Sequence, residues 1–276
     1  MKAVYKYIVD ESDPELAVDL LFLKTGLSKQ KIKKCINAGG LWIDMASDSS
    51  NKLRRFKKIK RRIYCGDRVE FYYDDNAVAD IKESPFVLYE TDDFGLWFKP
   101  VNILSQGSRF GDKHSMPAII KKKRGKDAYL VNRLDKETSG VIALAYNGKV
   151  AAILGTLWQG KVKKIYQAIV KGVLEPDFGE IRSLIDNKRS TTKYKTVKVL
   201  DNGTSFVEVE LKTGRKHQIR RHFSDAGHPV MGDPRYGKNN SDPKGLRLLA
   251  AGVSFVNPLN GKGVSVVIPD EYLFWL

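Results

Sequence analysis

From about residue 84 onward, short apolar runs alternate with turn residues, and this pattern limits the possible fold more than any other feature. Residues 87–89 and 96–98 flank a turn at 92–95, and Asp201-Asn202-Gly203 separates two further runs. An Asn-Gly pair between two strands is a strong hairpin signal. Strands joined by tight turns pair antiparallel, whereas a doubly wound sheet needs a crossover helix between its strands. The pattern therefore predicts an α+β fold with a mixed, mainly antiparallel sheet.

The same part of the chain contains other elements with clear periodicity. Apolar spacing predicts helices over 148–158 and 215–226, and Gly227 ends the second. Runs of β-branched and aromatic residues predict further strands at 165–170, 194–200, 207–211 and 252–256.

The N-terminal part has a helical pattern instead. Asp13 is predicted to cap a helix that ends at Gly26, and Ser28 is predicted to cap a second helix over 30–38. Short strands are predicted at 41–43 and 69–73, and a linker at 74–84.

A chain of 276 residues fits two domains of unequal size. We therefore predict a small α+β domain over residues 10–75 and a larger domain over residues 84–276.

The basic charge is concentrated in the small domain. The chain has 48 Lys and Arg against 32 Asp and Glu, a net charge of +16. Residues 52–62 alone carry eight basic side chains. An excess of this size indicates a polyanionic partner, with nucleic acid first and an acidic membrane surface second. A solvated basic face is the alternative interpretation of the run.

Several classes of protein do not fit the sequence. It has no run of about 20 apolar residues, and its first residues lack the apolar core of a signal peptide. Two cysteines and four scattered histidines do not resemble a disulfide framework or a metal site. We expect a soluble, cytoplasmic protein without a bound metal.

Two polar segments are candidates for a functional site. Residues 131–138 form a polar loop that enters an apolar strand, and Asp135 lies in that loop. The alternative is that Asp135 only forms an Asx turn with Thr138. Residues 213–222 begin a helix with several basic side chains, which could bind a phosphate or form a solvated helix face.

Taken together, these segments resemble an RluA-type pseudouridine synthase. Residues 133–140 read Arg-Leu-Asp-Lys-Glu-Thr-Ser-Gly, and residues 213–222 read Thr-Gly-Arg-Lys-His-Gln-Ile-Arg-Arg-His. Gly232-Asp233-Pro234-Arg235-Tyr236-Gly237 and the strand around Tyr166 also follow the family pattern. The N-terminal part is similar to the alpha-L RNA-binding domain of this family.

The resemblance implies an enzyme that isomerises uridine to pseudouridine in RNA without a metal or cofactor. Asp135 would be the essential carboxylate, acting on the sugar or on the base. Arg220 would pair with Asp135 and orient it. Tyr166 would stack on the uracil and supply a hydroxyl for proton removal.

The resemblance also implies residues that bind the RNA. Arg133 would fill the space left by the flipped base, because its planar guanidinium can stack where a base was. Leu248 would line the base pocket. The other predicted RNA-binding residues are Arg215, His217, Lys29, Lys33, Arg54, Lys57, Lys58 and Arg61.

Four positions depart from the family pattern. Asn132 replaces a usual His, Asn102 a Gly, Leu249 a His and Asn257 a His. They indicate a divergent branch and make the RNA target harder to infer.

We expect a monomer that acts on ribosomal RNA of the large subunit, because a separate basic domain suits a large RNA. The alternatives are a tRNA pseudouridine synthase and a non-catalytic RNA-binding or ribosome-assembly factor on the same fold. A nuclease would need clustered carboxylates, and a methyltransferase would need a Gly-rich nucleotide loop, neither of which is evident.

Overall fold

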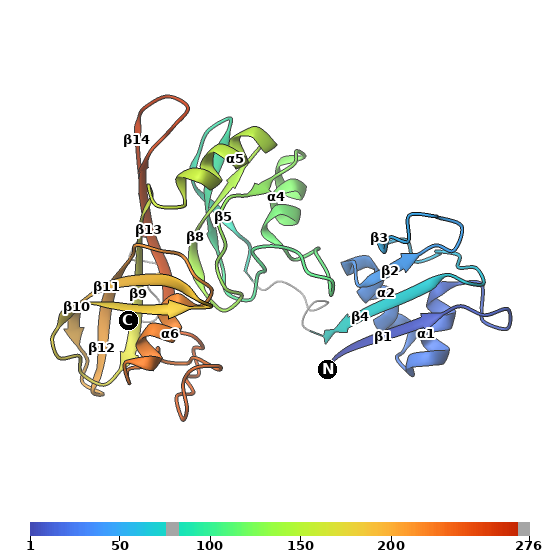
Figure 1. Cartoon of the computed structure of the whole chain (residues 1–276), viewed down its shortest axis with the longest axis horizontal. Coiled ribbons are helices and arrows are strands. Elements are labelled where there is room, and N and C mark those ends of the chain that lie inside the picture. Colours follow the sequence, from blue (N-terminus) through green and yellow to red (C-terminus); the bar gives the residue numbers. More distant parts are fainter. Residues whose placement is uncertain (76–82, 270–276) are drawn as a thin grey trace. The chain divides into compact units, whose positions relative to one another are not determined.

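The computed structural model describes residues 1–75 and 83–269, which divide into two compact units (Figure 1). Unit 1 holds residues 1–75 together with 106–119, and unit 2 holds the rest. The linker predicted at 74–84 falls largely on residues 76–82, which lie outside the described residues. Within the described ranges, no helix is long and apolar enough to cross a membrane.

Unit 1 is a four-stranded antiparallel sheet covered on one face by two helices. The strand order is β1-β4-β2-β3. Val69, Phe71 and Tyr73 of β4 belong to the buried core that also contains the apolar residues of both helices. The elements are β1 (Lys2–Ile8), α1 (Ala17–Thr25), α2 (Lys29–Ala38), β2 (Leu41–Asp44), β3 (Arg54–Phe56) and β4 (Arg68–Asp74).

The two helices begin differently from each other. The Ser28 hydroxyl accepts a hydrogen bond from the backbone N–H of Lys31, so the predicted cap of α2 is confirmed. The predicted cap of α1 is wrong, because α1 begins after Leu16, which makes no side-chain cap. Asp13 is instead buried against Lys24, with 2.9 Å between the charged groups, near the other end of that helix.

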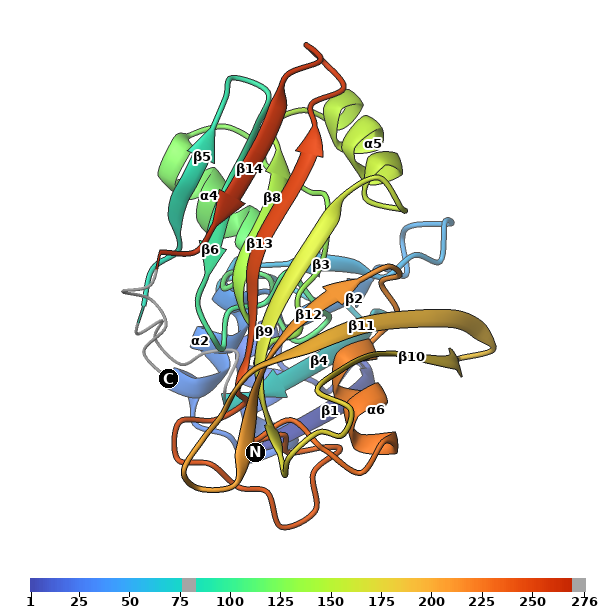
Figure 2. The same ribbon diagram turned by 90° about the vertical axis from the view of Figure 1, so that its left-hand side faces the viewer.

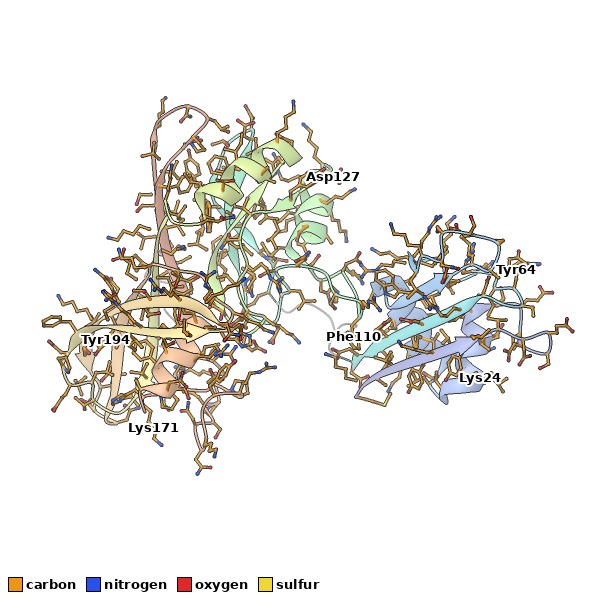
Figure 3. The ribbon with its side chains drawn as sticks, in the orientation of Figure 1. Lys24, Tyr64, Phe110, Asp127, Lys171 and Tyr194 are labelled. Atoms are coloured by element: carbon orange, nitrogen blue, oxygen red, sulfur yellow. The ribbon has the colours of Figure 1, made fainter. Side chains whose placement is uncertain are left out.

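The second face of the unit 1 sheet is covered by residues 106–112. Glu70 and Tyr72 alternate with the core residues of β4 and therefore point to this face. Arg109 donates hydrogen bonds to both, at 3.3 Å and 2.6 Å. Phe110, labelled in Figure 3, packs edge-on against Tyr72 with 5.4 Å between ring centroids.

These contacts change the domain ranges predicted from the sequence. The small unit starts at β1, not at residue 10, because β1 pairs with β4 along its whole length. It also includes residues 106–119, which the sequence prediction assigned to the larger domain.

Unit 2 contains a ten-stranded sheet, and the predicted mixed, mainly antiparallel α+β fold is confirmed. Its main path runs β10-β11-β12-β9-β13-β8-β6-β5, with β14 on β13 and β7 on β8. Among the described pairings, β8 with β13 is parallel and the others are antiparallel. The strands are β5 (Phe86–Glu90), β6 (Phe94–Lys99), β7 (Tyr129–Leu130), β8 (Ser139–Ala145), β9 (Lys163–Lys171), β10 (Phe178–Ile185), β11 (Lys188–Val199), β12 (Thr204–Leu211), β13 (Leu248–Val256) and β14 (Gly263–Val267).

Helix α4 (Met116–Arg124) begins in unit 1 and ends in unit 2, and the described part of unit 2 also contains α5 (Gly148–Leu157) and α6 (Gln218–Asp225). Val150 and Leu154 of α5 pack into one core with strands β6, β8 and β13. Ile219 and Phe223 of α6 pack into another with β9 and β12. Helix α6 begins three residues later than predicted, because residues 213–217 form a loop.

The middle of the sheet brings together the segments that sequence analysis selected. Figure 2 shows β9 and β13 side by side, and β8 pairs with β13 on its other edge. Gly140, at the start of β8, has φ +119°, and a Cβ there would lie 2.3 Å from the carbonyl oxygen of Ala250. Only glycine allows this close parallel pairing, which fixes where the loop before β8 ends.

Candidate active site

The loop that carries Asp135 is held by hydrogen bonds from outside it. The Ser105 hydroxyl donates to the carbonyl of Leu134 at 2.6 Å and accepts from its N–H at 2.9 Å. The carboxylate of Asp135 accepts a hydrogen bond from Arg220 at 3.2 Å, which is the contact expected from the resemblance. The backbone N–H of Thr138 donates to the backbone carbonyl of Asp135 at 3.2 Å, which differs from the Asx turn considered above. The side-chain carboxylate of Asp135 contacts Arg220 instead.

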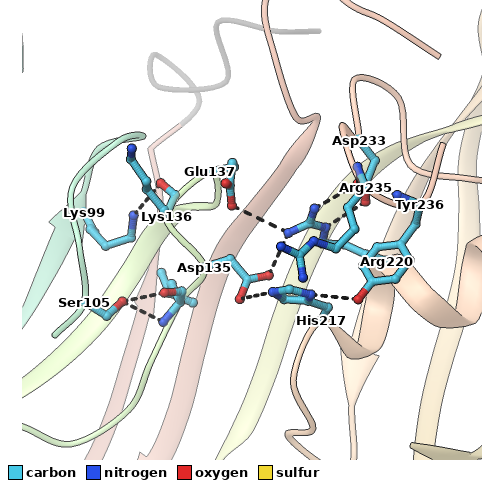
Figure 4. A network of polar contacts seen from close by, with 11 residues as sticks. Lys99, Ser105, Asp135, Lys136, Glu137, His217, Arg220, Asp233, Arg235 and Tyr236 are labelled. Carbon is cyan, nitrogen blue, oxygen red and sulfur yellow. Dashed lines mark hydrogen bonds and ion pairs between the residues drawn. The ribbon is translucent and has the colours of Figure 1, made fainter. Parts of the chain in front are cut away.

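Arg220 is held mainly by a residue that the sequence analysis did not select. Its side chain is 2% exposed, and it donates to the two carboxylate oxygens of Asp233 at 2.7 Å and 2.8 Å (Figure 4). The remaining nitrogen, Nη1, lies 3.2 Å from Asp135 and 3.6 Å from Glu137. The bidentate pair with Asp233 therefore fixes the guanidinium so that Nη1 of Arg220 faces the carboxylate of Asp135.

Asp233 and Arg220 stay ionised although both are buried. Burial alone would raise the pKa of Asp233, but hydrogen bonds from Arg220 and from two backbone N–H groups bring it below its ordinary value. Burial likewise opposes the charge on Arg220, but Asp233 and then Asp135 raise its pKa above the usual range. The charge of Arg220 is therefore constant over any pH at which the protein is folded.

The loop before α6 is fixed by the buried amide of Gln218. Its oxygen accepts from the Thr213 hydroxyl at 2.8 Å and from the Arg215 N–H at 2.9 Å. Its nitrogen donates to the carbonyl of Thr191 and the hydroxyl of Thr192 on β11. This satisfied amide sets the direction of residues 213–217, which reach the pocket before the helix starts.

His217, predicted from the resemblance to bind RNA, lines the pocket beside Asp135. Its Nε2 lies 3.5 Å from Oδ1 of Asp135. Its Nδ1 lies 2.9 Å from the hydroxyl of Tyr236, as Figure 4 shows. His217 therefore contacts the same carboxylate as Arg220, on the other oxygen.

Beside Asp135 is an open pocket with about 380 Å³ of empty space. Tyr166 from β9 and Leu248 from β13 line it, together with the exposed side chains of Arg133 and Arg215. Burial and then the charge of Asp135 raise the pKa of Tyr166, so its hydroxyl is neutral at neutral pH. All three predicted catalytic residues thus border one concave site in unit 2.

Like Asp233, Lys99 is a buried titratable residue that was not selected from the sequence. It is 0% exposed, and its ammonium donates to the carbonyls of Pro100, Ile103 and Lys136 at 3.0, 3.0 and 3.4 Å. Burial lowers the pKa of Lys99 to about 7. The side chain ties the end of β6 to the loop that carries Asp135.

The four departures from the family pattern have local structural roles. Asn102 adopts φ +65°, a left-handed conformation that asparagine tolerates better than most residues. The amide oxygen of Asn132 accepts from the N–H of Ala143 at 2.8 Å. Leu249 is fully buried in the core, and Asn257 accepts from the N–H of Leu259 in a turn. None of the four lines the pocket.

The predicted RNA-binding residues of unit 1 fall into two groups. Lys29, Arg54 and Lys57 form ion pairs with Asp19, Asp48 and Asp112, each at 2.6 Å. Arg61 stacks on Phe56 with 4.4 Å to the ring centroid. Lys33 and Lys58 are exposed, and the described part of the chain gives neither an ion-pair partner.

Sequence signals existed for the residues that were missed. Asp233 and Tyr236 belong to the Gly-Asp-Pro-Arg-Tyr-Gly motif, but the motif gives no partner for either side chain. Lys99 ends a strand whose residues are all buried, which is unusual for a solvated lysine. Among the described residues, no group of His, Cys, Asp and Glu has the arrangement of a metal site.

Comparisons with known proteins agree with this geometry. The protein-family model for RNA pseudouridylate synthase matches residues 93–225. The chain is 31% identical to the ribosomal large subunit pseudouridine synthase C of Buchnera aphidicola, over 68% of each chain. It is 29% identical to the tRNA pseudouridine synthase C of Vibrio parahaemolyticus, over 64% of this chain and 86% of that one.

A solved structure shares the fold. Human RNA pseudouridylate synthase domain containing 1 superimposes with a TM-score of 0.59 at 23% identity, covering 70% of this chain and 86% of the human one. The family match and the Buchnera relative show that the chain belongs to the RNA pseudouridine synthases of the RluA type. It is therefore an isomerase that converts uridine to pseudouridine in RNA.

We predict that Asp233→Asn lowers both stability and turnover. Removing one partner of a buried ion pair costs about 3 kcal/mol. Because the pKa of Asp233 lies below its ordinary value of 3.8, its contribution is complete above that pH and is lost as the pH falls through the folded pKa. The difference in unfolding free energy between wild type and variant should thus be constant near neutrality and shrink in acid. Urea unfolding at several pH values measures it.

The matched control is Asp242→Asn, because Asp242 also accepts two hydrogen bonds from one arginine, Arg247, and neither residue lines the pocket. It should cost stability and leave turnover unchanged. Equal turnover of the wild type and folded Asp233→Asn would show that the Arg220 pair serves the fold alone.

Proposed function

We propose that Asp135 is the catalytic carboxylate of this isomerase and that Arg220 orients it. The observation that carries this proposal is the convergence of Asp135, Arg220 and Tyr166 on one pocket, from three segments far apart in the sequence. A carboxylate on the rim of the pocket can attack the sugar or take a proton, and either role needs it ionised and held. A guanidinium that is itself fixed by Asp233 provides such a support.

Tyr166 and Leu248 are proposed to hold the uracil. The target base has to leave the RNA stack, at a cost of a few kcal/mol, and an aromatic ring with an apolar neighbour suits its flat faces. Because the Tyr166 hydroxyl is neutral at rest, it can take the C5 proton only if its own proton is passed on. Arg133, exposed at the pocket edge, is proposed to occupy the space that the base leaves.

We predict that Asp135→Asn abolishes pseudouridine formation, with stability and RNA affinity nearly unchanged. Asparagine keeps the size of the side chain but has neither the charge nor the nucleophilic oxygen. Tritium release from RNA labelled at uridine C5 measures turnover, and filter binding measures affinity. Asp186→Asn, an exposed aspartate outside the pocket, is the control and should behave as wild type. Turnover by Asp135→Asn close to wild type would remove Asp135 from the mechanism.

The proposed substrate is ribosomal RNA of the large subunit. Two relatives that are 31% identical over about two thirds of both chains are ribosomal large subunit pseudouridine synthases. The small basic unit supports this choice, because a second contact far from the reacting uridine suits a large RNA. An enzyme with this substrate would work in the cytoplasm. A tRNA substrate is the second candidate, because the Vibrio relative is a tRNA pseudouridine synthase.

Mapping of pseudouridines in total RNA decides between the two. We predict that a deletion strain lacks at least one pseudouridine of the large ribosomal RNA. A plasmid copy of the wild type should restore it, and a copy with Asp135→Asn should not. A loss confined to tRNA would contradict the ribosomal assignment and leave the chemistry of the pocket unaffected.

We also propose that unit 1 contacts RNA phosphates through its unpaired lysines. Exchange of Lys33 and Lys58 for glutamine should lower the salt slope of RNA binding by about 0.7 to 0.9 for each lost contact. Exchange of Lys29 and Arg54 should lower it less, because these side chains have carboxylate partners within the protein. Binding is measured against salt concentration. Identical slopes for wild type and Lys33→Gln/Lys58→Gln would show a solvated face instead.

A further inference from the structure

His217 links the candidate catalytic carboxylate to a tyrosine that no step of the proposed reaction uses. Its ring lies between Oδ1 of Asp135, 3.5 Å from Nε2, and the hydroxyl of Tyr236, 2.9 Å from Nδ1 (Figure 4). The rings of His217 and Tyr236 meet edge to face at 71°. This arrangement fixes both nitrogens of the imidazole.

The chemistry of the two partners selects one tautomer of the ring. Because an ionised carboxylate only accepts hydrogen bonds, a hydrogen bond across the 3.5 Å between Nε2 and Asp135 requires the hydrogen on Nε2. In a neutral imidazole, Nδ1 then has a lone pair, and the Tyr236 hydroxyl donates to it. Asp135 therefore selects the tautomer, and the Tyr236 hydroxyl, which can donate or accept, supports it by donating to Nδ1.

The backbone of His217 is held in a conformation that the residue would not choose alone. Its φ of 53° is left-handed, which costs on the order of 1 kcal/mol for a residue other than glycine. The surrounding contacts maintain it. The carbonyl of His217 accepts from Arg221 at 2.9 Å in the first turn of α6, and Gln218 fixes the preceding loop.

Asp233 accepts hydrogen bonds from both segments that contact Asp135, directly or through His217. Its oxygens accept from Arg220 and also from the backbone N–H of Tyr236 at 3.0 Å. The carbonyl of Tyr236 accepts from the Ser224 hydroxyl at 2.7 Å. One buried carboxylate thus fixes Arg220, which reaches Oδ2 of Asp135, and Tyr236, which reaches Oδ1 through His217.

We propose that His217 is a positioning residue for the isomerisation, holding Oδ1 of Asp135 through Nε2–H in the tautomer that Tyr236 supports by donating to Nδ1. This inference rests on the proposed role of Asp135. Arg220 alone holds one oxygen and leaves the carboxylate free to rotate about its bond. A second donor on the other oxygen fixes the plane of the carboxylate toward the pocket.

The charged and titratable groups around His217 keep the ring neutral. Burial lowers its pKa, the charge of Asp135 opposes that shift, and the charges of Arg220, Arg235 and Lys216 lower the pKa further. These groups come from the loop before β8, from α6 and the loop before it, and from the loop that contains Tyr236. Tyr166 of β9 lines the same pocket and is neutral.

Protonation of His217 would change the site in a definite direction. The cation would need an acceptor at both nitrogens, so Tyr236 would have to turn its hydroxyl, and the carboxylate would be held in an ion pair. Asp135 already contacts the cation of Arg220, and a second cation beside it would make it a weaker nucleophile and a weaker base. The reaction rate should therefore fall in acid with the pKa of His217, which lies below the ordinary value of 6.5.

The test is the single-turnover rate and the RNA dissociation constant of three variants between pH 5 and 8. His217→Leu removes the donor, and we expect a rate about 10- to 100-fold lower with an unchanged dissociation constant. His217→Gln keeps an N–H near the position of Nε2, so it should recover much of the rate and lose the acid limb. Tyr236→Phe removes the hydroxyl that donates to Nδ1 and supports the ring of His217, so it should lower the rate with unchanged RNA affinity. His228→Gln, the same exchange outside the Asp135 pocket, should behave as wild type.

Two outcomes would overturn the inference. A wild-type rate in His217→Leu at saturating RNA, with or without weaker binding, would make His217 an RNA contact or a bystander. An acid limb that persists unchanged in His217→Gln would assign that limb to another group. If His217→Leu does not fold, His217→Gln and Tyr236→Phe decide. The Asp135→Asn variant separates the two proposals, because an inactive Asp135→Asn beside a fully active His217→Leu refutes only the role of His217.

Discussion

The buried ion pair between Arg220 and Asp233 is the interaction on which the site depends. Removing two charges from water costs several kcal/mol for each ion, and only close, bidentate geometry offsets that cost. Both oxygens of Asp233 are used in this pair through Nε and Nη2 of Arg220, and Nη1 remains for Asp135. The same aspartate fixes the loop that contains Tyr236. The pair therefore joins α6, the loop around residue 233 and the Asp135 loop into one rigid unit.

The sheet also fixes the position of the Asp135 loop. Gly140 allows β8 to pair in parallel with β13, and this pairing sets where the Asp135 loop enters the sheet. Lys99 and Ser105 hold the loop from the side of β6 through backbone carbonyls. The candidate nucleophile is thus on a loop, but nearly every contact of that loop is to a strand or to a buried side chain. Such support is what a reaction that depends on orientation requires.

Local patterns in the sequence predicted the local features well. Ser28 was identified as a cap because a capping residue acts within its own first turn. Hairpins with clear turn residues were likewise found. The Asp13 cap was wrong because α1 begins only after Leu16, and the pairing of Asp13 with Lys24 depends on how the helix packs. Strand β1 was missed although its residues alternate, because its exposed positions include Val4 and Ile8 as well as lysines.

The features that could not be predicted depend on contacts between distant residues. Residues 106–112 look like an ordinary polar loop, and only the folded unit shows that they cover the face with Glu70 and Tyr72. The family resemblance identified Asp135 and Arg220 as partners. It did not show that Arg220 makes its two shorter hydrogen bonds to Asp233, or that His217 faces Asp135. Motifs therefore identified the residues, and the fold determined which side chains meet.

The most direct test of this account is the single-turnover rate of Arg220→Lys. Lysine keeps the positive charge but cannot bind Asp233 with two N–H groups and Asp135 with a third. If orientation of Asp135 by a fixed fork is essential, the rate should fall by about 100-fold with RNA affinity unchanged, since small misplacements have effects of that size. A folded Arg220→Lys enzyme that reacts at the wild-type rate would show that charge alone suffices, and it would contradict a central role for the Arg220–Asp233 pair.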